Sequence, residues 1–152
     1  MRNTVEHDEQ AAFVAQVLYQ YRNDPTFIED VFFSVPNGAY LGGRGHRQMY
    51  WLKAEGVRPG VSDILYLQAR GDYNCLAMEF KAPSRYKEKR GGVTDEQENF
   101  LLGVIKGGGR AVVCYGADVA INVFDAYMKL EATMQPVIGI DLSFLLVAAP
   151  EG

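Results

Sequence analysis

Two carboxylates and a lysine occupy spacings that could support hydrolysis of a phosphate ester. Asp63 opens one apolar run, and Glu79 and Lys81 stand one residue apart near the end of the next. Because residues i and i+2 of a strand project from the same face, Glu79 and Lys81 should share a face. The turn signal at residues 71–74 lies near the midpoint between the two runs. A hairpin would therefore bring Asp63 beside Glu79.

These three residues predict a metal site with a positively charged side chain beside it. Two carboxylates that converge repel each other unless a cation joins them. Hard oxygen ligands with positions left to water and phosphate suit Mg²⁺. A lysine ammonium nearby could orient or deprotonate an attacking water, or offset charge on the scissile phosphate. The alternative is structural: Asp63 caps a strand, and Glu79 and Lys81 form an exposed surface pair.

The elements that must position these residues follow from hydrophobic spacing and turn signals. Helical periodicity predicts helices over residues 5–22, 46–54, 94–106 and 117–130. Short apolar runs predict strands over residues 31–35, 64–67, 76–80 and 110–115, the middle two as a hairpin. Thr94 and Gln97 have the spacing of a capping box. This order predicts an α/β fold with a mixed β-sheet flanked by helices.

Two segments fit no core element. Residues 83–93 are polar and contain glycines, so a mobile loop is expected there. Residues 136–147 are apolar and predict a strand or a short helix, which would cover a sheet edge or contribute to a dimer interface. The chain of 152 residues has no internal repeat and no linker, which predicts a single domain.

Composition excludes several classes of protein. The chain is 48% hydrophobic and 22% charged, as in ordinary globular proteins. No apolar run approaches the ~18–20 residues that a membrane span needs, and the polar, acidic start is no signal peptide. Cys75 and Cys114 lie far apart beside apolar residues and lack zinc-site spacing. They indicate buried thiols in a reducing compartment, so we expect a cytoplasmic protein.

Basic residues gather in two segments of a chain whose net charge is −4. Residues 37–60 contain four basic residues and one acidic residue, and residues 81–92 contain five basic residues and one acidic residue. Such segments are either solvated loops or a local surface for phosphates, because affinity for a polyanion follows the local patch. Charge alone leaves both interpretations open.

A set of short motifs, in a fixed order and spacing, resembles a known family. The motifs lie at residues 35–38, 53–63, 78–83, 94–97 and 108–115. Together they resemble the VRR-NUC (virus-type replication-repair nuclease) family of the PD-(D/E)XK nuclease superfamily. The resemblance covers a core of about residues 5–130, so that residues 131–152 form a C-terminal appendage to the single domain.

The resemblance implies a restriction-endonuclease-like core and a DNA endonuclease that depends on Mg²⁺ or Mn²⁺. Asp63 and Glu79 would ligate the metal, assisted by the backbone carbonyl of Phe80. Lys81 would be the catalytic lysine. Gln97, at the start of its helix, would point into the site and position Lys81 or a water.

The family also supplies a glutamate from its first helix. Glu6 fits best, because it lies four residues before Gln10 and both would face one side of the helix. Glu9 is the rival, and spacing alone does not separate the two. Either glutamate could instead serve only as favourable charge at a helix N-terminus.

Residues of the basic segments are candidate contacts to DNA. A glycine-rich stretch at residues 38–45 is typical of a phosphate-binding loop, since glycine lets backbone amides approach an anion. The candidates are Asn37, Arg44, Arg47 and Arg58 in the first segment and Arg85, Lys87, Lys89 and Arg90 in the second. The second group would clamp the duplex backbone without reading sequence. Tyr50 and Trp51 would stack on bases or simply pack, and packing is the commoner outcome for Trp51.

The sequence thus predicts a metal-dependent DNA endonuclease. The resemblance implies a homodimer that cuts branched DNA such as four-way junctions, and the expected setting is the cytoplasm of a bacterial or phage-infected cell. Two alternatives remain: a non-catalytic nucleic-acid-binding module on the same fold, and a nuclease acting on RNA or on simple duplex DNA. The presence of Asp63, Glu79, Lys81 and Gln97 counts against the first alternative.

Overall fold

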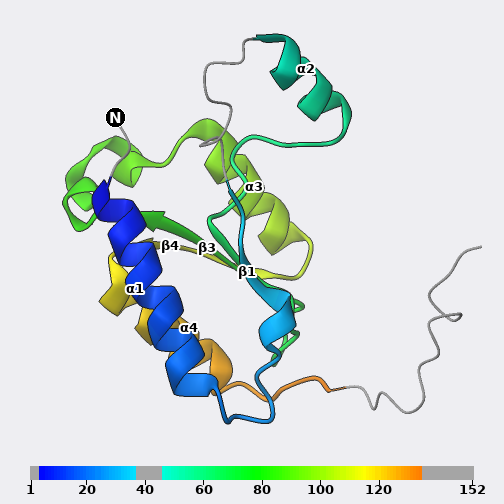
Figure 1. Ribbon diagram of the computed structural model, residues 1–152, viewed down its shortest axis with the longest axis vertical. Coiled ribbons are helices and arrows are strands. Elements are labelled where there is room, and N and C mark those ends of the chain that lie inside the picture. The colour runs from blue at the N-terminus through cyan, green and yellow to red at the C-terminus, as the bar shows by residue number, and fades with distance from the viewer. Residues whose placement is uncertain (1–3, 37–45, 135–152) are drawn as a thin grey trace, which may run out of the picture.

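A four-stranded mixed sheet forms the centre of the protein (Figure 1). The computed structural model describes residues 4–36 and 46–134. The strands are β1 (Phe32–Ser34), β2 (Ile64–Tyr66), β3 (Leu76–Lys81) and β4 (Arg110–Tyr115), in the spatial order β1-β2-β3-β4. The first three strands are antiparallel, whereas β4 runs parallel to β3. The predicted mixed α/β sheet is confirmed.

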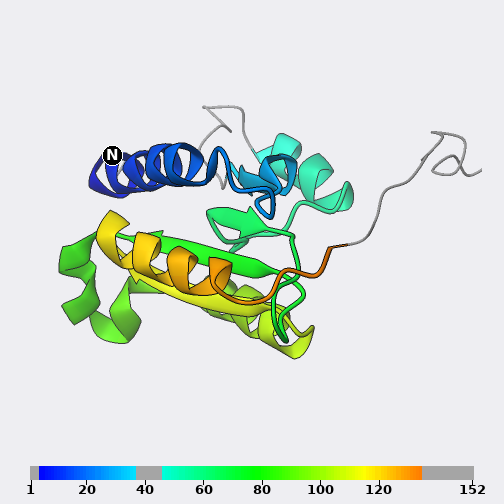
Figure 2. The ribbon, with the colours of Figure 1, turned by 90° about the horizontal axis from the view of Figure 1, so that it is seen from below.

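Helices cover both faces of this sheet. Helices α1 (Thr4–Tyr21) and α4 (Ala117–Met128) lie side by side on one face, and α3 (Asp95–Lys106) packs against the other. In Figure 2, α1 and α3 lie on opposite sides of the strands. Helix α2 (His46–Ala54) stands apart, beyond the start of α3 (Figure 1). The four predicted helices and four predicted strands are all present, with ends shifted by one or two residues.

Aromatic side chains fill the core between α1, α4 and the sheet. The rings of Phe13, Phe27, Phe32, Tyr66 and Phe124 pack with centroids 5.4 to 6.3 Å apart, mostly tilted or edge to face. Such arrangements match the quadrupoles of the rings and bury large apolar areas. The even-numbered residues of β3, such as Met78 and Phe80, point into this core. The odd-numbered Glu79 and Lys81 therefore project from the opposite face, towards α3.

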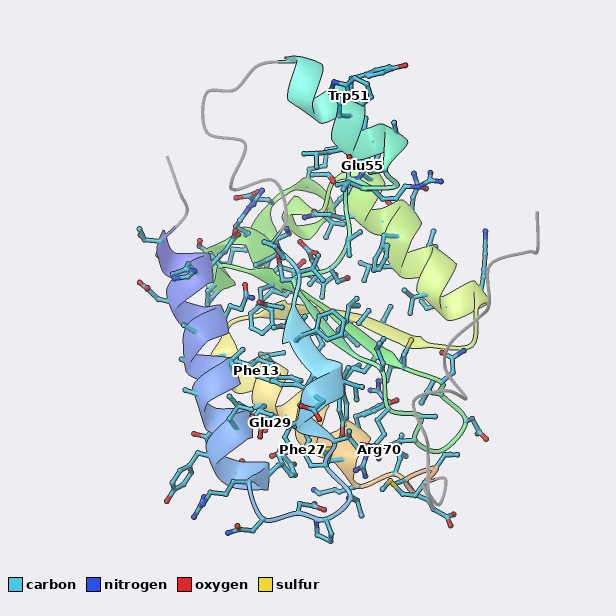
Figure 3. All side chains as sticks on the ribbon, turned by 45° about the vertical axis from the view of Figure 1, so that its right-hand side comes forward. Phe13, Phe27, Glu29, Trp51, Glu55 and Arg70 are labelled. Atoms are coloured by element: carbon cyan, nitrogen blue, oxygen red, sulfur yellow. The ribbon has the colours of Figure 1, made fainter. Side chains whose placement is uncertain are left out.

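A buried arginine ties the loops below this core together. Arg70 is only 1% exposed, and Figure 3 shows it lower than Phe13 and level with Phe27. Its guanidinium donates to the carbonyls of Met128 and Leu130 at 2.7 and 3.2 Å, at the end of α4. It also donates to the carbonyl and the hydroxyl of Thr26 at 2.7 and 2.8 Å, in the segment after α1. One side chain thus joins two helix ends that are far apart in sequence.

The segment at residues 83–93 differs from the predicted loop. It folds into two 3-10 turns, η2 (Pro83–Lys87) and η3 (Lys89–Gly92). The hydroxyl of Tyr115 donates to the carbonyl of Gly91 at 2.9 Å and stabilises the second turn. Local composition does not reveal such a long-range contact. Residues 136–147, predicted as a strand or helix, lie outside the described residues.

The structure tests the expectations about the two cysteines and about membrane-spanning helices. Cys114 is buried, as predicted, and burial raises its pKa to about 12. Cys75 is only half-buried, which departs from the prediction, because it lies just before β3 begins, beside the exposed turn. Both thiols are free. Among the described residues, no helix is long and apolar enough to cross a membrane.

Candidate functional site

The β2–β3 hairpin brings the two predicted carboxylates together. Ile64 pairs with Met78, so the register places Asp63, the residue before β2, opposite Glu79. The backbone N–H of Phe80 donates to Oδ2 of Asp63 at 2.8 Å, which fixes the aspartate against the end of β3. The expected juxtaposition of Asp63 and Glu79 is therefore confirmed.

Glu79 is a buried carboxylate with one oxygen bound and the other open. It is 1% exposed, and Oε1 accepts from Nζ of Lys81 at 2.7 Å; Lys81 itself is 4% exposed. Oε2 is buried with no hydrogen-bond partner among the residues that the structure describes. The pKa of Glu79 is raised to about 7: burial is the largest cause, the negative charge of Asp63 acts in the same direction, and the bond from Lys81 opposes both. The alternative of an exposed surface pair is wrong, because both side chains are buried.

Gln97 links this pair to the first turn of α3. Its Oε1 accepts from the backbone N–H of Thr94 at 3.0 Å, and Oγ1 of Thr94 accepts from the backbone N–H of Gln97 at 3.2 Å. The predicted capping box is thus present. The same amide donates through Nε2 to Oε1 of Glu79. Gln97 therefore caps its helix and points into the site at the same time.

The loop leading to Asp63 is fixed against the same helix turn. At Gly60 the backbone has φ +79°, and a Cβ there would lie 2.4 Å from the carbonyl oxygen of Glu96. Only glycine fits so close an approach with this backbone conformation. The start of α3 therefore sets the positions of Gln97 directly and of Asp63 through the loop.

The two candidate glutamates of α1 reach different places. Oε1 of Glu6 accepts from the backbone N–H of Ala82 at 3.1 Å, next to Lys81, and lies 3.4 Å from Nη1 of Arg85. Oε2 of Glu9 accepts from the backbone N–H of Ala117 at 2.6 Å, at the start of α4. The structure thus brings Glu6 to the end of β3, whereas Glu9 contacts the N-terminal turn of another helix, where a negative charge is favourable.

This division predicts different consequences for a matched pair of variants. Each of Glu6→Ala and Glu9→Ala removes the acceptor of one backbone N–H, so each should lower the free energy of unfolding by about 1 kcal/mol. Only Glu6→Ala should also slow DNA cleavage, by about tenfold, because it removes a charge that acts near Glu79. Chemical denaturation and cleavage rates measure the two effects. A slower Glu9→Ala with an unaffected Glu6→Ala would reverse the assignment.

Some of the predicted DNA-binding residues form salt bridges within the protein, and others are exposed. Arg58, Lys87 and Lys89 are exposed. Arg85 pairs with Glu6 and Glu88, and Arg90 pairs with Asp95 and Glu98. Asn37 and Arg44 lie outside the described residues, and only the backbone of Arg47 is described, within α2. The contact between Arg85 and Glu6 was missed by sequence reasoning, because the two residues are 79 positions apart.

The residues present fit a divalent metal ion. Mg²⁺ prefers hard oxygen ligands, needs only one or two carboxylates and keeps several waters. Asp63 and Glu79 supply two carboxylates, and the buried Oε2 of Glu79 is an oxygen whose burial is costly without a partner. Within the described ranges, no group of three or more His, Cys, Asp or Glu side chains could hold a metal. Backbone carbonyls and water would have to complete the shell.

Comparisons with known proteins bear on the family and the fold. A family model of the VRR-NUC domain matches residues 41–118, just over half of the chain. A solved structure described as a VRR_NUC domain protein has a TM-score of 0.65 and 24% sequence identity, and the match covers 86% of this chain and 93% of that chain. No curated protein matches.

The mixed sheet, its flanking helices and this structural likeness define an α/β fold of the nuclease type. The chain belongs to the VRR-NUC family. The family resemblance inferred from the sequence motifs is therefore confirmed. The roles of the individual site residues stay predictions.

Proposed function

We propose that the protein is a metal-dependent DNA endonuclease that hydrolyses phosphodiester bonds. The observation that supports it most is the buried pair of Glu79 and Lys81 facing Asp63. Burying an ion pair costs desolvation that its attraction barely offsets, so such a pair is weak evidence for a stabilising role. Buried ionisable groups that interact with one another are typical of functional sites.

In this proposal the chain's own residues hold and orient the reacting groups. Asp63, Glu79 and the carbonyl of Phe80 would hold Mg²⁺ or Mn²⁺, which when bound polarises the phosphate and favours deprotonation of water. The ammonium of Lys81, held 2.7 Å from Oε1 of Glu79, orients the attacking water or offsets charge on the phosphate. Gln97 holds Glu79 from the side of α3. Glu6 orders the segment after Lys81 through its bond to Ala82.

The finer parts of the proposal rest on the family resemblance. They are selectivity for branched DNA such as four-way junctions, action as a homodimer and a cytoplasmic location. The exposed Arg58, Lys87 and Lys89 support contact with a phosphate backbone. None of the three forms a salt bridge with an acidic side chain in the part of the chain that the structure describes. A homodimer would carry two sites, as paired cuts across a junction require.

The test measures cleavage of labelled duplex, single-stranded, flap and four-way-junction DNA, and of RNA, with Mg²⁺, Mn²⁺ or EDTA. The wild type should cut DNA with either metal and not in EDTA. Asp63→Asn should cut at least about a hundredfold more slowly, because a bound metal is worth several kcal/mol in the transition state. Asp72→Asn, in the exposed turn at the other end of the same hairpin, is the control and should match the wild type.

Binding without cutting by the wild type, under every metal, would leave a non-catalytic nucleic-acid-binding module. Cutting confined to RNA would transfer the proposal to the other substrate class. The preferred DNA structure separates junction selectivity from general cleavage.

A further inference from the structure

Two neighbouring aromatic side chains on α2 are exposed to solvent. Tyr50 is 70% exposed and Trp51, the only tryptophan of the chain, is 56% exposed. Their rings meet edge to face with centroids 6.1 Å apart. Burying rings of this size is strongly favourable, so an exposed pair is unusual on a protein without a partner. The sequence expectation that Trp51 packs is wrong.

A short segment of chain joins the helix that carries this pair to the candidate site. In Figure 3, Trp51 and Glu55 lie on α2 beyond the sheet and the other helices. After α2 the chain forms a turn in which the backbone N–H of Val57 donates to the carbonyl of Leu52 at 2.9 Å. It then passes Gly60, which lies against the first turn of α3, and reaches Asp63. A ligand on α2 is therefore on the same end of the molecule as the two carboxylates.

The charge around the pair suits a polyanion. Lys53 and Arg58 follow the pair in the chain and are exposed, and Glu55 is the single acidic residue between positions 37 and 60. Aromatic faces combined with cations are the elements that bind single strands, in which bases stack on rings and phosphates contact the cations. A paired base offers only its edges, because its faces are already stacked in the duplex. The combination therefore favours unpaired bases.

We propose that Tyr50 and Trp51 form a stacking platform for unpaired bases of a DNA strand, at the end of the molecule that holds the candidate site. This inference rests on the proposed function, since it assigns to the substrate an unpaired stretch beside the bond that is cut. A duplex alone would occupy the cations and leave the rings empty. The platform makes unpaired nucleotides a part of the recognised structure.

The single tryptophan provides a direct test in EDTA, where metal-dependent cleavage does not occur. The probes are an oligothymidylate of about 12 nucleotides, a length within the site sizes of single-strand binders, and an abasic strand of equal length and charge. For the wild type, oligothymidylate should quench the tryptophan fluorescence and bind about tenfold more tightly than the abasic strand, the order expected for one stacked base. The double variant Tyr50→Ala, Trp51→Ala should bind both strands equally in an anisotropy titration.

A matched control separates stacking from exposure alone. Tyr19 is 68% exposed, has the guanidinium of Arg22 4.1 Å from its ring centroid, and lies near the far end of α1. Tyr19→Ala should keep the full preference for oligothymidylate. Trp51→Phe should keep most of the preference while losing the fluorescence signal. Circular dichroism checks that each variant is folded.

Three results would overturn the inference. The first is equal binding of the two strands by the wild type, and the second is an undiminished preference in the double variant. The third is a wild-type dimer in sedimentation that the double variant dissociates, because this would assign the aromatic pair to a second copy of the chain. Cleavage of plain duplex with Mg²⁺, measured separately, tests the proposed function, so that either proposal can fail while the other stands.

Discussion

Lys81→Met is expected to slow metal-dependent cleavage of DNA by about a thousandfold. Rate losses of this order follow when an enzyme loses a group that transfers a proton or a group that stabilises charge in the transition state. Methionine keeps the length and apolar stem of the side chain but removes the ammonium that lies 2.7 Å from Oε1 of Glu79. Gln97 still donates to the same oxygen, so Glu79 keeps one partner. Single-turnover cleavage with saturating protein measures the chemical step without a contribution from substrate binding.

The control for this variant is a lysine of the same helix as Gln97 but far from the site. Lys106→Met, in the exposed last turn of α3, removes the same charge from the protein and should leave the rate unchanged. Thermal unfolding of both variants shows whether a slow rate reflects lost structure. A folded Lys81→Met protein that cuts at the wild-type rate would show that Lys81 has no part in the reaction.

Arg70→Met is expected to lower the free energy of unfolding by about 3 kcal/mol, equivalent to about 10 °C in the midpoint of thermal unfolding. Two effects compete in this variant. Removing a buried charge recovers its desolvation cost, but the substitution also leaves the carbonyls of Met128, Leu130 and Thr26 without their donor. The second effect should dominate, because the four hydrogen bonds from Arg70 to Met128, Leu130 and Thr26 are lost together.

Arg70→Lys tests whether charge or shape is responsible. A lysine keeps the positive charge, but a single ammonium cannot reach both the end of α4 and Thr26, as the two Nη atoms of the guanidinium do. We therefore expect Arg70→Lys to be destabilised nearly as much as Arg70→Met. The exposed Arg22→Met is the surface control and should stay within about 0.5 kcal/mol of the wild type. An Arg70→Lys protein as stable as the wild type would show that the two-pronged shape of the guanidinium is not needed.

Local patterns were sufficient to predict the elements and the carboxylate pair. The register of a short hairpin follows from the position of its turn, so Asp63 could be placed opposite Glu79. The capping box of Thr94 and Gln97 is likewise a property of four consecutive residues. Spacing of apolar residues gave the helix and strand ranges, because it reflects which face of each element must be buried.

Contacts between distant segments could not be predicted in this way. Glu6 and Glu9 sit in the same helix turn with the same chemistry, and their partners Ala82 and Ala117 are 76 and 108 positions away. The second bond of Gln97, to Glu79, also depends on how α3 packs against the sheet. The ordered turns of residues 83–93 depend on Tyr115 of β4. Each requires the tertiary arrangement that local sequence does not contain.

The amide of Gln97 closes the first turn of α3 with its oxygen and contacts the buried carboxylate with its nitrogen. Helix ends fray in solution, and such local opening occurs without unfolding of the whole domain. Each time this turn opens, Glu79 loses one of the two donors on Oε1. The fraction of molecules with a complete site therefore cannot exceed the fraction in which the first turn of α3 is closed. Helix fraying, an equilibrium of a single turn, sets an upper limit on the population that is ready to react.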